Sequence, residues 1–256
     1  MWGVDVYYDG NSLYEALLSN FTGRYFWPPK KTWLLAYGNG SGEPKAIVFV
    51  KSYLGKSADE IENGMTRKVA ETGQNIARGN NIPFGVIEFE NDLQSLTFNR
   101  ERISLDSLRN RFKEVGLEVS GITNKNINSA TSSPYHQWQR NNLGQIRVSD
   151  FDLFAANTAE SEINRVIELK RSYIPLSDWE PYKADYPNFD LIARLCHKID
   201  AKFLIAYNVR HKSPNFLDDP SRIKIFEYKS DSGSKSLGIC ELSNFIQGKF
   251  DHLSAT

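Results

Sequence analysis

The most restrictive feature of this chain of 256 residues is a strand, a helix and a second strand in succession. Residues 165–170 alternate apolar and polar side chains, as a strand does. Residues 188–199 carry apolar side chains at helical spacing, and residues 202–209 form an almost continuous apolar run. Such a run is typical of a strand that is buried on both faces of a sheet. The segment therefore predicts a right-handed βαβ unit, and we expect an α/β protein built on a mixed sheet.

Acidic and basic side chains lie in the first of these strands and shortly before it. Glu168 and Lys170 are two residues apart, so they share one face of the strand. Asp150 and Asp152 share a face in the same way on a preceding apolar strand. Residues 153–167 are long enough to form a hairpin that brings the two strands side by side. We therefore expect two carboxylates and an ammonium group to meet on one surface.

This combination of side chains suits the hydrolysis of phosphodiester bonds. Mg²⁺ and Mn²⁺ prefer oxygen ligands, which Asp152, Glu168 and the backbone carbonyl of Leu169 would supply. A bound divalent cation polarises a phosphoryl oxygen and lowers the pKa of its bound water. Lys170 could position that water or offset the charge that develops on the phosphoryl group. An exposed strand whose Glu and Lys are only solvated is the alternative interpretation.

Asp152 followed by the Glu-Leu-Lys tripeptide at residues 168–170 resembles the catalytic motif of the PD-(D/E)xK nuclease superfamily. In that superfamily an Asp on one strand and an E-x-K on the next form the site within an αβββαβ core. With residues 135–142 as the opening helix, such a core would occupy residues 130–210 of this chain. Phe151, rather than proline, precedes Asp152, a difference that the superfamily tolerates.

The resemblance implies a Mg²⁺-dependent endonuclease, with Mn²⁺ as a possible substitute, that cuts double-stranded DNA. Asp152, Glu168 and Lys170 would be catalytic, and Asp152, Glu168 and the Leu169 carbonyl would hold the metal. The size of the chain and its extra region are most similar to a type II restriction endonuclease, and such enzymes act as homodimers. A non-catalytic module that binds nucleic acid or protein and retains the sheet is the alternative.

Four further residues are candidates for accessory roles at this site: Asp150, Glu162, Gln139 and Lys183. Asp150 could support Asp152, and Glu162 in the hairpin could approach a second metal. Gln139 lies on the expected opening helix, which in the resembled fold can send a polar residue toward the site. Lys183 could contact a phosphate from the loop after the E-x-K strand. An ordinary exposed position is the alternative for each of them.

A polar segment without periodicity, residues 123–134, predicts a linker or long loop. It divides the chain into an amino-terminal α+β region, residues 1–125, and a nuclease-like catalytic domain, residues 126–256. No internal repeat is evident in the sequence. Basic side chains around two predicted helices make the first region the candidate for substrate recognition. Acidic residues are interspersed among them, so ordinary solvated helix faces are the alternative.

Composition narrows the class of protein. Lys and Arg together number 31, as do Asp and Glu, so the net charge is zero. Proteins that wrap nucleic acid are often basic, so this balance counts against a nucleic-acid partner, although acidic metal ligands and an acidic outer face can hide a basic groove. The two cysteines do not form a disulfide framework, and the four histidines lack the spacing of a zinc site. No stretch resembles a signal peptide or a membrane span. We therefore expect a cytoplasmic protein without a membrane partner.

Overall fold

The computed structural model describes residues 12–52, 60–90, 93–120, 133–144, 146–156, 163–212 and 217–250, without the side chains of residues 60–62. These residues form six α-helices, one 3-10 helix and twelve strands, and the strands make two six-stranded sheets. Both sheets contain parallel and antiparallel pairs. The expected mixed α/β class is therefore confirmed. No helix in this described part of the chain is long and apolar enough to cross a membrane.

The two sheets take their strands from different parts of the chain. In spatial order, the first sheet consists of β7 (Arg147–Asp150), β2 (Thr32–Gly38), β3 (Pro44–Ser52), β4 (Phe84–Phe89), β5 (Leu96–Phe98) and β6 (Glu101–Arg102). The second consists of β1 (Tyr25–Phe26), β8 (Leu153–Ala156), β9 (Ile163–Ser172), β10 (Lys202–His211), β11 (Leu217–Lys229) and β12 (Gly233–Glu241). The helices are α1 (Ser12–Ser19), α2 (Glu60–Gly79), α3 (Leu105–Glu114), α4 (Pro134–Asn142), α5 (Tyr186–His197) and α6 (Leu242–Ile246), with the 3-10 helix η1 at Lys183–Asp185.

The same order of elements occurs twice along the chain. Residues 12–114, the first unit, run helix, three strands, helix, three strands, helix, and residues 134–246, the second unit, repeat that order. In each unit the central helix connects two parallel strands, β3 to β4 through α2 and β9 to β10 through α5. The other neighbouring strands in both sheets are antiparallel. The two units therefore share one topology.

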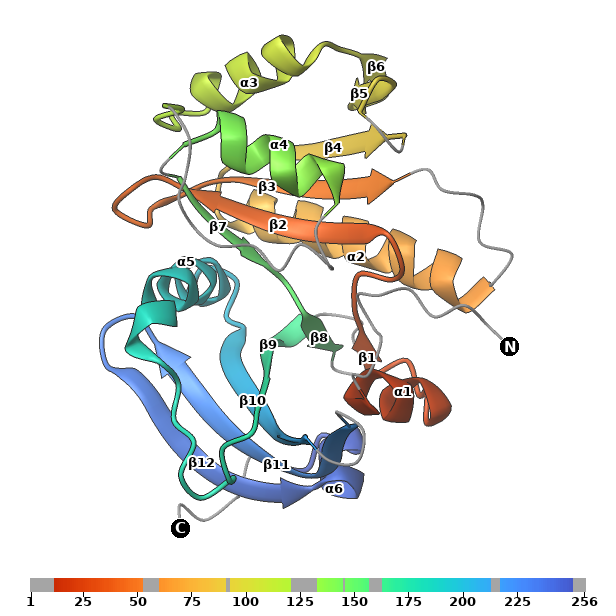
Figure 1. Ribbon diagram of the computed structural model, residues 1–256, viewed down its shortest axis with the longest axis vertical. Coiled ribbons are helices and arrows are strands. Elements are labelled where there is room, and N and C mark those ends of the chain that lie inside the picture. Colours follow the sequence, from red (N-terminus) through yellow and green to blue (C-terminus); the bar gives the residue numbers. More distant parts are fainter. Residues whose placement is uncertain are drawn as a thin grey trace.

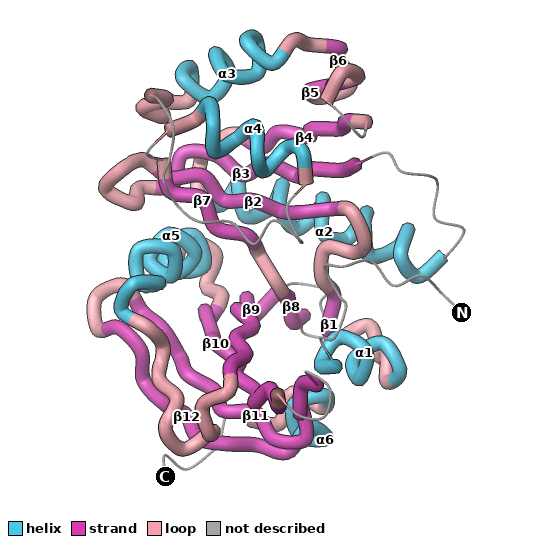
Figure 2. Tube along the Cα trace, viewed as in Figure 1, coloured by secondary structure: helices cyan, strands magenta, loops and turns pink. Residues whose placement is uncertain are grey.

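The units exchange their first strands. β1 of the first unit pairs with β8 in the second sheet, and β7 of the second unit pairs with β2 in the first sheet. The chain passes directly from β7 in one sheet to β8 in the other (Figure 2). The expected boundary between residues 125 and 126 therefore does not separate the two sheets. Local periodicity can identify an edge strand, but it cannot show which sheet that strand joins.

Helices and sheets alternate in layers. α3 and α4 cover the outer face of the first sheet, and α5 lies between the two sheets (Figure 1). α2 packs on the inner face of the first sheet and contacts α5, while α1 and α6 contact β11 of the second sheet. Alternate residues of β2 belong to two different hydrophobic cores. Leu34 and Ala36 lie in the central core that the two sheets share, whereas Trp33, Leu35 and Tyr37 lie in the outer core.

The predicted strand, helix and parallel strand are confirmed. β9 and β10 are parallel, and α5 connects them. The helix begins with Pro187 in its first turn, where proline is tolerated, and buries the predicted stripe of Phe189, Ile192 and Leu195. β10 is buried from residue 203 to residue 208, as its apolar run predicts. This rigid pair of strands carries the candidate site.

Candidate functional site

The hairpin between β8 and β9 brings Asp152 to the edge of β9. The strands are antiparallel with Leu153 opposite Ile167, so Asp152, just before β8, lies beside Glu168. The Oδ2 atom of Asp152 accepts a hydrogen bond of 2.8 Å from the Leu169 N–H. The side chain thereby occupies the edge of β9 where the neighbouring strand has ended. The prediction that these two acids come together agrees with this geometry.

Glu168 and Lys170 lie on one face of β9, as their spacing predicts. The Lys170 Nζ atom is 2.9 Å from Glu168 Oε1 and 3.7 Å from Asp185 Oδ2. It also lies 5.5 Å from the centre of the Phe189 ring on α5. The Glu168 side chain is 12 % exposed and the Lys170 side chain 30 % exposed. The amine is thus held among carboxylates at a place that solvent and ligands can still reach.

The acids repel one another in a poorly solvated place. Burial raises the pKa of Asp152 well above its usual value, and the negative charges of Glu168 and Asp150 add to the rise. Burial also raises the pKa of Glu168, while Lys170 opposes that rise. Burial lowers the pKa of Lys170, but its acidic neighbours, Glu168 first, outweigh this effect and raise it overall. A divalent cation between the acids would relieve the repulsion that Lys170 only partly balances.

The donor atoms fit an oxygen-ligated cation. In an extended strand, the N–H and C=O of one residue point to the same edge. Because the Leu169 N–H points to Asp152, the Leu169 carbonyl faces the same edge. Asp152, Glu168 and this carbonyl form the hard oxygen set that Mg²⁺ and Mn²⁺ prefer. No group of three or more His, Cys, Asp or Glu side chains within the described ranges is placed to hold a metal, so the carbonyl and water would have to complete the coordination.

The four candidate accessory residues do not all lie near the acids. Asp150 ends β7 and acts on the pKa of both Asp152 and Glu168, so it lies near the acids. Lys183 is exposed on η1, two residues before Asp185. Glu162 lies outside the described residues.

Gln139 belongs to a different part of the molecule. The Tyr37 hydroxyl donates a hydrogen bond of 2.6 Å to Gln139 Oε1 and shares another of 2.8 Å with the Tyr135 hydroxyl. These tyrosines and α4 pack in the outer core of the first sheet. The expectation that Gln139 supports the acid site is therefore corrected, because α4 covers the first sheet and not the second.

Two residues near the acids have no signal in the sequence. Asp185, at the end of η1, is the second acidic neighbour of Lys170. Tyr14 of α1 donates a hydrogen bond of 3.0 Å from its hydroxyl to the backbone carbonyl of Asp152. The helix α1 precedes Asp152 by more than half of the chain, and only the exchange of elements between the units brings them together.

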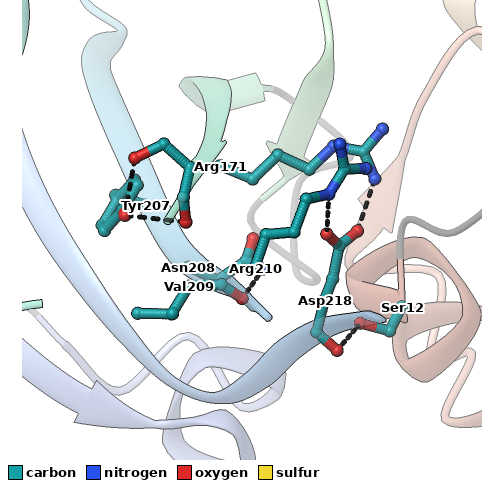
Figure 3. Close-up of polar contacts among 8 residues, drawn as sticks. Ser12, Arg171, Tyr207, Asn208, Val209, Arg210 and Asp218 are labelled. Carbon is teal, nitrogen blue, oxygen red and sulfur yellow. Dashed lines mark hydrogen bonds and ion pairs between the residues drawn. The ribbon is translucent and has the colours of Figure 1, made fainter. Parts of the chain in front are cut away.

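An ion-pair network around a buried carboxylate lies beside the start of α1, on the opposite face of β9. Arg171 and Arg210 both bind the carboxylate of Asp218, whose side chain is fully buried, and the Arg210 contact is 2.9 Å long (Figure 3). The Ser12 hydroxyl of α1 donates to the Asp218 backbone carbonyl. Two guanidinium groups give this buried carboxylate the pairing that it requires. The start of α1, the helix that carries Tyr14, is thus bonded to β11 of the second sheet.

Comparison with protein-family models, curated proteins and solved structures finds no match to this chain.

Proposed function

We propose that this protein is a metal-dependent endonuclease that hydrolyses phosphodiester bonds in double-stranded DNA. The observation that carries the proposal is the meeting of Asp152, just before β8, with Glu168 and Lys170 of β9. The order β8, β9, α5, β10 supports a resemblance to the last part of the PD-(D/E)xK core. The opening helix and first strand, α4 and β7, differ from that core because they lie on the other sheet. A type II restriction endonuclease that acts as a homodimer remains the most similar known class.

The chemistry divides among the residues of the site. Asp152, Glu168 and the Leu169 carbonyl would hold Mg²⁺ or Mn²⁺, which when bound polarises a phosphoryl oxygen and makes a water more acidic. Asp152 is positioned by the Leu169 N–H and, through its backbone, by Tyr14. The ammonium group of Lys170 can donate a hydrogen bond to the attacking water or to an oxygen of the phosphate. Glu168 keeps this group charged and oriented.

The direct test is incubation of the protein with plasmid and phage DNA in Mg²⁺ or in EDTA. Defined fragments that require Mg²⁺ would support a sequence-specific restriction endonuclease, and uniform degradation would indicate a non-specific nuclease. Intact DNA in both Mg²⁺ and Mn²⁺ would defeat the proposal. The second candidate, a non-catalytic binding module, is favoured by the lack of a third acidic or histidine ligand among the described residues. DNA that is bound without being cut would support that candidate.

A further inference from the structure

The two units present the same sheet face to their central helices. On β9 this face carries Val166, Glu168 and Lys170. Val166 pairs with Phe203 of β10, and the Phe203 ring contacts Phe189 of α5. The Lys170 ammonium lies over the same Phe189 ring, so the acidic face is the face toward the helix.

The first unit offers Ile47, Phe49 and Lys51 at the corresponding places. Ile47 and Phe49 belong to the central core together with apolar residues of α2, whereas Val48 and Val50 belong to the outer core. The first residue that β4 directs to α2 is Phe84, which pairs with Ile47, as Phe203 pairs with Val166.

This alignment places Phe49 where the second unit has Glu168, and Lys51 where it has Lys170. In β2, the residue opposite Phe49 is Leu34, which therefore takes the place of Asp152. If the alignment is shifted by two residues, which keeps the same face of each strand, the first unit still has no acid at these positions. On this face β2 offers Thr32, Leu34 and Ala36, and β3 offers Ile47, Phe49 and Lys51, so no register of these two strands supplies a carboxylate.

The helix also closes the face in the first unit. Leu34 is 0 % exposed, and a Cβ atom on Gly73 of α2 would lie 2.5 Å from Leu34 Cδ1. The glycine thus allows α2 to rest directly on the leucine. In the second unit, Glu168 and Lys170 remain partly accessible at the corresponding positions.

We infer that this chain is a fused pair of related units, of which the second alone retains a working acid site. Each chain then binds catalytic cations at one place and breaks one strand of a duplex at a time. This inference rests on the proposed function. It adds that each chain has one cation site, and that one encounter with DNA breaks one strand. A double-strand break requires a second chain or a second encounter.

The exchange of elements explains why the second unit needs the first, although the first has no acid site. It supplies β1 as a neighbour for β8, and Tyr14 as a hydrogen-bond donor to the Asp152 carbonyl. In return, the second unit supplies β7 as a neighbour for β2, and Tyr135 as a partner for Tyr37. Each sheet therefore needs elements of both units, and the inactive unit completes the surroundings of the active one.

The first test counts cation sites in the full-length protein. Mn²⁺ is titrated, and the free ion is measured by electron paramagnetic resonance in the wild type and in the double variant Asp152→Asn, Glu168→Gln. We expect the double variant to lose all stoichiometric binding. The control is Glu88→Gln, because Glu88 pairs with Lys51 on the corresponding face of the first unit. Binding that survives in the double variant, or that disappears in the control, would overturn the inference.

The second test follows supercoiled plasmid at protein concentrations at which light scattering shows a monomer. We expect open circles as the first product, with an initial rate proportional to the protein concentration. Linear DNA as the first product of a monomer would overturn the inference and leave the nuclease proposal intact. An intact plasmid together with one Asp152-dependent cation site would defeat the nuclease proposal but retain the single site. Absence of Mn²⁺ binding in the wild type would overturn both.

Discussion

The two units carry different side chains at corresponding positions of the same topology. The first unit has Leu34, Phe49 and Lys51 where the second has Asp152, Glu168 and Lys170. In the first unit the apolar pair packs beneath α2 and stabilises the sheet. In the second, two carboxylates share a poorly solvated place, which raises the pKa of both. The comparison teaches that a cluster of acids and a well-packed apolar core are alternative uses of the same surface.

The comparison is tested most strongly by lysine substitutions at corresponding positions. Lys170→Ala should lower the cleavage rate by roughly 10²–10³-fold or more, because it removes the cation that balances developing charge. Asp152→Ala and Glu168→Ala should abolish cleavage, because each removes a proposed metal ligand. Lys51→Ala is the matched control, and we expect it to change the rate by less than about twofold, the size of a neutral surface change.

Initial rates on plasmid DNA measure this difference, and circular dichroism confirms that each variant is folded. Equal rates in Lys170→Ala and the wild type would remove the site assignment. A large loss of activity in Lys51→Ala with an unchanged fold would show that the first unit takes part in the chemistry.

In contrast to the cleavage rate, the free energy of unfolding should depend more on the first unit than on the acid site. Leu34→Ala and Phe49→Ala should each lower the free energy of unfolding by about 2–5 kcal/mol, because both leave a cavity in a packed core. Asp152→Ala should cost far less, since it removes a repelled carboxylate. Leu217→Ala, at a position that is 57 % exposed, controls for the loss of the leucine side chain itself. Urea unfolding gives the comparison, and a Leu34→Ala protein as stable as Leu217→Ala would contradict the packing described.

The pH dependence gives a smaller and more specific effect. A raised pKa means that the folded protein holds the Asp152 proton more tightly than the unfolded chain does. The stability of the wild type therefore falls as the pH rises from the ordinary carboxyl pKa, about 3.9, through the raised one. In metal-free buffer, Asp152→Asn should therefore be more stable than the wild type at pH 8 and equal to it near pH 4.

Urea unfolding at pH values from just below the ordinary carboxyl pKa of about 3.9 up to pH 8 measures this difference. Asp231→Asn, at an exposed turn, controls for the loss of one negative charge. A stability difference that grows toward low pH would show that Asp152 is stabilised as the anion in the folded protein, contrary to the geometry above.

The sequence predicts the part of the site that depends on local periodicity. The alternation in β9, the stripe of α5 and the apolar run of β10 indicate a parallel pair with Glu168 and Lys170 on one face, as the structure has it. The hairpin distance is enough to bring Asp152 beside them. Each of these features follows from the period of a strand or helix and from connections between neighbours in sequence.

The sequence fails where the fold depends on distant pairing. The partners of the short strands β1 and β7 lie far away along the chain, so the exchange and the sharing of both sheets have no local signal. The sequence does not reveal the repeated topology, because residues at corresponding positions differ in polarity and charge, as Leu34 and Asp152 do. Because of the same exchange, Gln139 contacts the first sheet and Tyr14 contacts Asp152.

Tyr14 provides the finest comparison of the two units, since each exchanged helix carries a buried tyrosine that bonds across to the other unit. Tyr14→Phe removes the hydroxyl that holds the Asp152 carbonyl, and a hydrogen bond of this kind contributes about 0.5–1.5 kcal/mol. We expect a loss of roughly two- to tenfold in Mn²⁺ affinity, because the bond orients a metal ligand. Tyr135→Phe should lower the free energy of unfolding by a similar amount without a change in Mn²⁺ affinity, because its partner lies in the outer core. If both variants lose stability and neither loses affinity, Tyr14 has a packing role only, and the first unit supports the second without shaping its site.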